Sequence, residues 1–413
     1  MINYRLEDDM KLKYFPAKPP ISPLLLRFLV TRSGGSGFTL LELLIAMVIG
    51  SIIVSTLLYG VVNILQTDQR DASRSDTQRD MQMAIDYITR DVREATYVYG
   101  ITQDTTTNSD GTTSLGPKES CLYDYGAGSL ARGISGKCTG LLNYLPAFLK
   151  AADNRPVLAF WKAEPLPSLI QNSCRTSAGN VGKVSTDTGY SANLNATPCV
   201  AQRMYTLVVY SLNTNNAAPN AIWRGKARIM RYQLPHFTEV AGIGEINDGW
   251  VAPIAKDKRP RTWPIGNGND TSGVLTPNIN LQPKAPLPTG NQVLTDFVDN
   301  QAVTTYVPGY CPNGFDAPNG FTDSGVNAAF NPAFYVCVRS GALTAAAGSS
   351  SSASLATEAA EAAGQGINPE VHIVLKGNAA GRGGIPLLTG EVPFQMETRV
   401  LSRGAFGKLS NNN

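Results

Sequence analysis

Histidine is nearly absent from this sequence, since only His236 and His372 occur among 413 residues. The two are far apart along the chain, and His372 lies in a strand-like run, so neither a histidine-based triad nor a His-rich metal site is indicated. The sequence also lacks a G-x-x-x-x-G-K-[ST] phosphate loop, a G-x-S-x-G elbow and an H-E-x-x-H zinc motif. We therefore predict a protein that is not an enzyme and has neither cofactor nor metal.

Charge is also scarce, at 16% of residues, and the net charge is only +3. Residues 1–37 hold six basic and three acidic side chains, which leaves 29 of each sign in the rest of the chain. The net charge outside residues 1–37 is therefore zero, which argues against a basic nucleic-acid surface, so we expect no nucleic-acid partner. With 39 glycines and 26 prolines, the composition is typical of a loop-rich extracytoplasmic protein.

No cysteine occurs before residue 121, and no C-x-x-C spacing occurs anywhere, which argues against a zinc site. An even number on one side of a membrane anchor indicates disulfides in an oxidising compartment. Pairing of nearest neighbours is our hypothesis, and free buried thiols are the alternative. The expected pairs are Cys121–Cys138, Cys174–Cys199 and Cys311–Cys337.

The long apolar run is what the sequence does contain. Residues 38–65 carry a single charge, Glu42, and as a helix they would be roughly 42 Å long, enough to cross a membrane. The run is too long for an ordinary secretory signal, and no A-x-A-like cleavage site follows it. Basic residues precede it, which places residues 1–37 in the cytoplasm and the rest of the chain outside. A carboxylate at that depth is costly in lipid and indicates a function.

The junction reads Gly37-Phe38-Thr39-Leu40-Leu41-Glu42. It resembles the signal of type IV pilins and of type II secretion pseudopilins. The resemblance implies that a prepilin peptidase cleaves between Gly37 and Phe38 and that the new N-terminus of Phe38 is methylated. Residues 1–37 would then be a leader peptide, and Glu42 would be the fifth residue of the mature chain.

The chemistry of the motif supports this interpretation. Cleavage leaves an α-ammonium group on Phe38, and inside a bundle of apolar helices that cation needs a partner. Glu42 of a neighbouring subunit is the natural one, which makes an assembly salt bridge. The alternative is a plain signal anchor in which Glu42 extends to the membrane surface.

No proline occurs between Phe38 and Gly100, so we predict one long helix over residues 38–97, with 38–65 spanning the membrane. The lack of a proline at Tyr59, where major pilins often have one, favours a minor subunit. Apolar residues then recur at helical spacing and predict a face that packs on a sheet. They are Met81, Ile85, Ile88, Val92 and Ala95.

Residues 98–413 are predicted to form a β-rich head, which gives an α+β fold: a long N-terminal helix packed on a mainly antiparallel sheet with long irregular loops. Residues 141–151 predict a short helix broken by Pro146. Residues 255–292 and 340–366 predict flexible surface insertions. Strands are expected over 156–163, 205–212, 227–234, 371–375 and 397–401.

The order of these elements is similar to minor pilins of the PilW kind and to the J-type pseudopilin. Residues 85–99 also resemble pseudopilins of hormogonium polysaccharide secretion. The resemblance implies a methylated, single-pass inner-membrane subunit with a periplasmic head, built into a type IV pilus or a pseudopilus for motility, protein secretion or polysaccharide secretion. Its partners would be the prepilin peptidase, other major and minor pilins, and the assembly platform.

The alternative function is an adhesive or substrate-binding tip module for a polysaccharide or a protein, with Trp250 and Trp263 as candidate contacts. Arg224, Arg228 and Arg231 are expected on the solvent face of their strand. Two oxygen-rich turns, around Asp104 to Asp110 and Asp316 to Asp323, leave Ca²⁺ loops open as an alternative, although neither fits the EF-hand template.

Overall fold

The structure is a computed structural model. It describes residues 39–100, 106–107, 113–114, 122, 140–171, 202–214, 222–240, 243–253, 260, 263–269, 275–301, 310–312, 315–318, 330–339, 370–382 and 393–402. The chain divides into two units, residues 1–65 and 66–413, each considered by itself below.

Helix α1 runs without a break over Leu40–Arg93. Its residues up to Leu65 belong to the first unit, and its apolar side chains there are exposed. In the second unit the predicted apolar face is buried: Met81, Ile85, Ile88 and Val92 are each at most 4% exposed. The periodicity therefore identified the correct face of this helix.

The end of the helix differs from the prediction of residue 97. Strand β1 (Ala95–Val98) follows α1 almost at once and pairs with β4 (Asn154–Pro165). Thr96, Tyr97 and Val98 are β-branched or aromatic and favour a strand, and their pairing with β4 outweighs continuation of the helix.

The main sheet contains nine of the described strands, and every pair within it is antiparallel. The order is β1-β4-β5-β6-β11-β14-β13-β12, and β15 also pairs with β14. The further bounds are β5 Arg203–Asn213, β6 Ala227–Pro235, β11 Asn291–Val298, β12 Phe315–Asp316, β13 Phe334–Arg339, β14 Glu370–Asn378 and β15 Pro393–Leu401.

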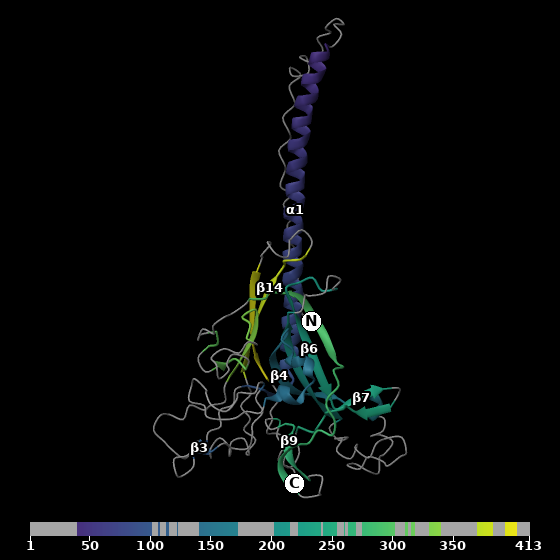
Figure 1. Cartoon of the computed structure of the whole chain (residues 1–413), viewed down its shortest axis with the longest axis vertical. Coiled ribbons are helices and arrows are strands. Elements are labelled where there is room, and N and C mark those ends of the chain that lie inside the picture. Colours follow the sequence, from purple (N-terminus) through teal and green to yellow (C-terminus); the bar gives the residue numbers. More distant parts are fainter. Residues whose placement is uncertain are drawn as a thin grey trace, which may run out of the picture. The chain divides into compact units, whose positions relative to one another are not determined.

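This sheet is curved and nearly barrel-shaped, and the C-terminal part of α1 lies along it (Figure 1). The hydroxyl of Ser402, just after β15, donates a hydrogen bond to the carbonyl of Ala95 at the start of β1. This bond connects the end of β15 with β1, the first strand in the sheet order. The predicted fold class, a long helix packed on an antiparallel sheet, is confirmed.

Two hydrophobic cores lie on the two faces of the sheet. One contains the apolar face of α1 with Phe160, Val208, Ile229 and Val336. The other contains side chains of the opposite face, such as Trp161 and Tyr232, beneath the 3₁₀ helices η1 (Leu141–Tyr144) and η2 (Ala147–Lys150). Because both faces are covered, the central strands are apolar on both sides.

All five predicted strands are present. Strands β4, β5 and β14 extend beyond the predicted bounds at both ends. Strand β6 begins where predicted and ends later, and β15 ends where predicted and begins earlier. The broken helix over 141–151 is the η1–η2 pair, interrupted at Pro146. Strands β11 and β13 were not predicted. Small two-stranded sheets complete the fold: β2 (Thr106–Thr107) with β3 (Thr113–Ser114), β7 (Phe237–Val240) with β8 (Ile243–Ile246), and β9 (Ile265–Asn269) with β10 (Leu275–Asn280).

The prediction of an irregular excursion over 255–292 is wrong in part, because this segment contains hairpin β9–β10. Trp263 is only 2% exposed and its ring packs edge-on against Trp161, 5.4 Å away. Trp250 is 9% exposed and donates to the carbonyl of Tyr205. Both tryptophans are core residues, so they are not the exposed ligand contacts that we expected. Residues 340–366 lie outside the described part of the chain.

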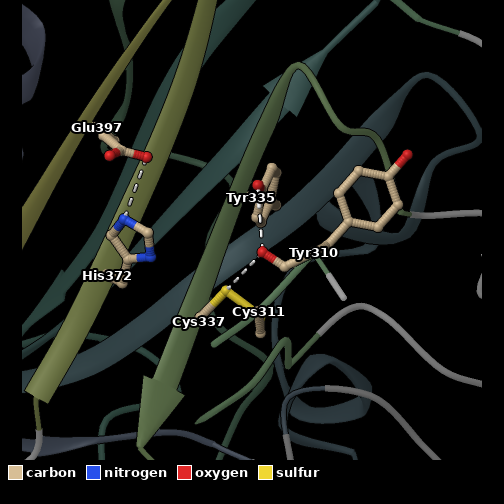
Figure 2. The surroundings of a disulfide bond; sticks show 6 residues. All are labelled: Tyr310, Cys311, Tyr335, Cys337, His372 and Glu397. Carbon is tan, nitrogen blue, oxygen red and sulfur yellow. Dashed lines mark hydrogen bonds and ion pairs between the residues drawn. A yellow bond between two sulfur atoms is a disulfide. The ribbon is translucent and has the colours of Figure 1, made fainter. Parts of the chain in front are cut away.

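A disulfide joins Cys311 to Cys337 of β13, with 5.6 Å between the Cα atoms. This is one of the three pairs expected from sequence order; the other four cysteines lie outside the described residues. Figure 2 shows Tyr310 and Tyr335 beside the bond, and the Tyr335 hydroxyl donates to the Tyr310 carbonyl at 3.4 Å. On the neighbouring strand, His372 lies 3.6 Å from Glu397, so His372 is a sheet residue, as expected.

The other histidine, His236, is buried just before hairpin β7–β8. Its ring stacks on Trp250 at 3.5 Å and on Phe237 at 3.8 Å between centroids, and it is 3% exposed. Burial lowers the pKa of His236 from 6.5 to about 3. Between about pH 3 and pH 6.5 the ring is therefore neutral in the folded protein, whereas in the unfolded chain it binds a proton.

Acid should weaken the fold through His236. Below pH 6.5 the unfolded state binds a proton that the folded state does not, so stability falls as the pH falls towards the folded pKa of about 3. Between pH 6.5 and 4 the loss is about 3 kcal/mol. Denaturant titrations at several pH values should show this slope, and His236→Phe should remove it. His372→Gln is the control; an unchanged slope in His236→Phe would contradict the assignment.

Candidate functional site

The structure describes only part of the predicted processing site. Gly37 and Phe38 lie outside them, whereas Thr39 and Glu42 are described. The Thr39 hydroxyl accepts a hydrogen bond from the backbone N–H of Glu42 at 3.3 Å, so Thr39 caps the start of α1. The Glu42 side chain is exposed, and no ion pair is found for it among the described residues. Its predicted partner, the Phe38 amine, would exist only after cleavage.

The helix that follows is the one described helix that is long and apolar enough to cross a membrane. Between Leu40 and Leu65 all its large apolar side chains are at least 48% exposed. In water such a surface would be strongly unfavourable, but in lipid or among other helices it is not. This arrangement is consistent with a single-pass inner-membrane anchor.

The second unit contains a cluster of buried charges that connects α1 to the sheet. Asp91, near the end of α1, accepts three hydrogen bonds: from Lys162 of β4 at 2.9 Å, from the Tyr210 hydroxyl of β5 at 2.7 Å and from Arg231 of β6 at 2.9 Å. Asp91, Lys162 and Arg231 are each at most 7% exposed. Glu164 pairs with the other side of Lys162. The cluster has two positive and two negative groups.

Burial and pairing act in opposite directions on these groups. Burial by itself would raise the pKa of Asp91, but the charge of Arg231 and the bonds from Tyr210 and Lys162 outweigh it and lower the pKa below 3.8. For Lys162, burial would lower the pKa, but Glu164 and Asp91 raise it above 10.5. Asp91 and Lys162 are therefore both charged at neutral pH.

The cluster anchors the helix on the sheet at one position. Asp91 lies in the last turn of α1, where the helix dipole disfavours an acidic side chain, so its two cationic partners are needed. Arg231 was expected on the solvent face of its strand, which is wrong: it is 5% exposed and also donates to Gln233 at 2.6 Å. The sequence signal was present, since Asp91 lies next to Val92 within a buried helical face.

A cleft of about 650 Å³ opens beside α1 in the same unit. It is lined by Asp80 and Tyr87 of α1, Trp223 before β6, Asp296 and Phe297 of β11, and Arg382 after β14, among others. Trp223 is 38% exposed and Tyr87 is 41% exposed. Neither residue was recognised from sequence, because single aromatic residues in loops and on helices give no periodic signal.

Comparison with known proteins identifies the N-terminal part of the chain. A family described as the prokaryotic N-terminal methylation motif matches residues 32–58. No curated protein and no solved structure matches the chain significantly. The motif supports a type IV pilin-like family. It implies processing by a prepilin peptidase and assembly with other pilins, and it suggests a structural protein rather than an enzyme.

Proposed function

We propose that the chain is a minor pilin or pseudopilin. It inserts in the inner membrane, is processed between Gly37 and Phe38, and is incorporated into, or primes, a type IV pilus or a type II secretion-like pseudopilus. The observation that carries this proposal is the methylation motif at residues 32–58, which continues into a helix whose apolar side chains are exposed up to Leu65. Tyr59, in place of a proline, supports a minor subunit.

The proposal includes a periplasmic head. The basic leader supports this orientation, because positive residues remain on the cytoplasmic side. The Cys311–Cys337 disulfide supports it too, since such bonds persist in oxidising compartments. Glu42 is proposed to pair with the N-terminal amine of Phe38 in an adjacent subunit.

A second candidate function is a substrate-binding tip module. The observation in its favour is the cleft beside α1 with its exposed Trp223 and Tyr87. The two functions are compatible, because the first depends on the N-terminal helix and the second on the head. Trp250 and Trp263, the contacts expected from the sequence, are not proposed for this role, since both pack in the core.

Mass analysis of the N-terminus tests the first proposal. Protein from membranes and sheared filaments should lack residues 1–37 and begin with methylated Phe38. Gly37→Val should leave the chain at full length, because a side chain at the cleavage position obstructs the extended backbone in the peptidase. Gly35→Val, in the same leader, is the matched control and should be processed normally. Normal processing of Gly37→Val would contradict the assigned cleavage site.

A further inference from the structure

Arg382, one of the charged side chains that line the cleft beside α1, is already paired within the protein. Arg382 donates to Asp80 of the helix and lies 3.9 Å from Asp76. Its guanidinium also lies over the Phe297 ring, 4.6 Å from the centroid. Arg382 therefore connects α1 with β11 and has a fixed position before any ligand arrives.

Asp296 of β11 holds another part of the cleft wall. One of its carboxylate oxygens accepts hydrogen bonds from the backbone N–H groups of Arg224 at 2.9 Å and Gly225 at 3.0 Å. These bonds fix the segment that carries Trp223. Gly225 is needed for this approach, because a Cβ atom there would lie 2.4 Å from the backbone nitrogen of Phe297.

The backbone of this wall is strained. Phe297 has a φ of +61°, which is unusual for a bulky side chain. Such a conformation is energetically unfavourable, persists only where its surroundings enforce it, and is concentrated at functional sites. Arg382 over the ring and Gly225 against the backbone are the contacts that enforce it.

The aromatic side chains of the cleft are both accessible and oriented. Tyr87 is part of α1, and the Arg231 guanidinium lies 5.7 Å from its ring. Arg231 is itself held by Asp91. The buried charge cluster thus supports the Tyr87 side of the cleft, and the Asp296 bonds support the Trp223 side. The partly exposed rings of Tyr87 and Trp223 therefore line the same cavity, and each lies on a segment that is held by its own set of contacts.

We propose that this cleft binds a neutral carbohydrate chain. Its lining holds two acidic side chains, Asp80 and Asp296, and two basic ones, Arg224 and Arg382, so it carries no net charge that would favour a cation or an anion. A purely apolar ligand would cover Asp80, Asp296 and Arg382 without replacing their contacts with water, which is unfavourable. A sugar ring presents an apolar C–H face to Trp223 and Tyr87, and its hydroxyl groups bond to fixed carboxylate and guanidinium groups. This inference deepens the proposed tip-module function.

The test uses the full chain in a zwitterionic phosphocholine detergent, because alkyl maltosides carry sugar headgroups that would compete. The purified protein is applied to an array of neutral and anionic oligosaccharides, and the best neutral binder is titrated by calorimetry. We expect binding of neutral oligosaccharides. Trp223→Ala and Tyr87→Ala should each weaken it by about tenfold or more, because each removes a stacking surface.

Two controls separate loss of the site from loss of the fold. Leu287→Ala changes an apolar side chain that is 50% exposed and does not line this cleft, so its affinity should equal wild type. Tyr87→Phe keeps the ring and should retain most of the affinity. The far-ultraviolet circular dichroism spectrum and the unfolding midpoint of each variant should match wild type.

Three results would overturn the proposal: no neutral oligosaccharide binds, only anionic ones bind, or binding is unchanged in both alanine variants. A photo-crosslinking amino acid in place of Trp223 gives an independent result. Cross-links from this position to another protein, or to another part of this chain, would show that the cleft has a polypeptide occupant. Because these tests use isolated protein, their failure leaves the processing and assembly proposal unaffected.

Discussion

Replacing Asp91 by asparagine is expected to lower the free energy of unfolding of the head by about 3 to 5 kcal/mol. Asparagine has nearly the same shape and can still accept one of the hydrogen bonds. It lacks the negative charge, however, and leaves Lys162 and Arg231 buried with Glu164 as the one remaining anion of the cluster. The loss comes mainly from the uncompensated cation and less from the missing bonds.

Denaturant unfolding followed by tryptophan fluorescence measures this change. Asp86→Asn is the matched control, because Asp86 lies on the same helix, is exposed and accepts a hydrogen bond from the Gln82 side chain at 3.1 Å. It should change stability by less than about 0.5 kcal/mol. A similar effect of the two substitutions would contradict the anchoring role of Asp91.

A double variant tests the charge argument directly. Asp91→Asn with Lys162→Met again leaves equal numbers of positive and negative groups in the cluster, Arg231 and Glu164, so it should be less destabilised than the sum of the two single variants. The stability supplied by Asp91 should also be present above about pH 3.8 and disappear as the pH falls through its lowered folded pKa. Purely additive effects would show that the side chains contribute independently.

The parts of the fold that follow local periodicity could be predicted. The face of α1 that contains Met81, Ile88 and Val92 repeats at helical spacing, and each of these side chains is fully buried. Strands β4, β5 and β6 are rich in β-branched and aromatic residues. In contrast, β11 (NQVLTDFV) has register breaks after Val293 and Thr295. Its polar and apolar residues do not alternate regularly, so the sequence did not indicate a strand.

The contacts that join distant segments could not be predicted. Asp91 and Arg231 are 140 residues apart, and nothing local indicates that one neutralises the other. The same holds for Arg382 and Asp80, which are separated by 302 residues. Trp250 and Trp263 lie in Pro- and Gly-rich surroundings that resemble exposed loops, yet both rings fill the core beneath the sheet. The composition of these segments predicts irregular backbone, but it does not predict whether the tryptophan side chains are buried. Their burial depends on which surface of the protein the segment packs against.

The methylation motif and the head lie in different units of the chain, so they can be tested separately. The methylation motif involves residues 32–58, and the buried charges and the cleft lie in the second unit. A variant that alters one should therefore leave the other intact, which allows assembly to be tested without disturbing the fold. Glu42 is the best residue for this purpose, because its side chain is exposed and makes no described contact that stabilises the head.

Glu42→Gln is expected to be processed and methylated normally but to enter filaments at least about tenfold less efficiently than wild type. After cleavage at Gly37, the α-ammonium of Phe38 must be buried among apolar helices, and without a carboxylate partner that costs several kcal/mol. The fraction of the subunit in sheared filaments, relative to membranes, measures the effect. Mass analysis of the same samples establishes that the N-terminus is methylated Phe38.

Two comparisons separate pairing from a general effect of charge. Asp68→Asn removes an exposed carboxylate just beyond the apolar span of the same helix and should assemble normally. Glu42→Asp keeps the charge on a shorter side chain and should fall between Glu42→Gln and wild type, because the pair depends on reach as well as on sign. Wild-type incorporation of Glu42→Gln would show that the amine finds another partner. In that case Glu42 would be left with the role of a carboxylate at the N-terminus of a membrane helix, where the helix dipole favours it.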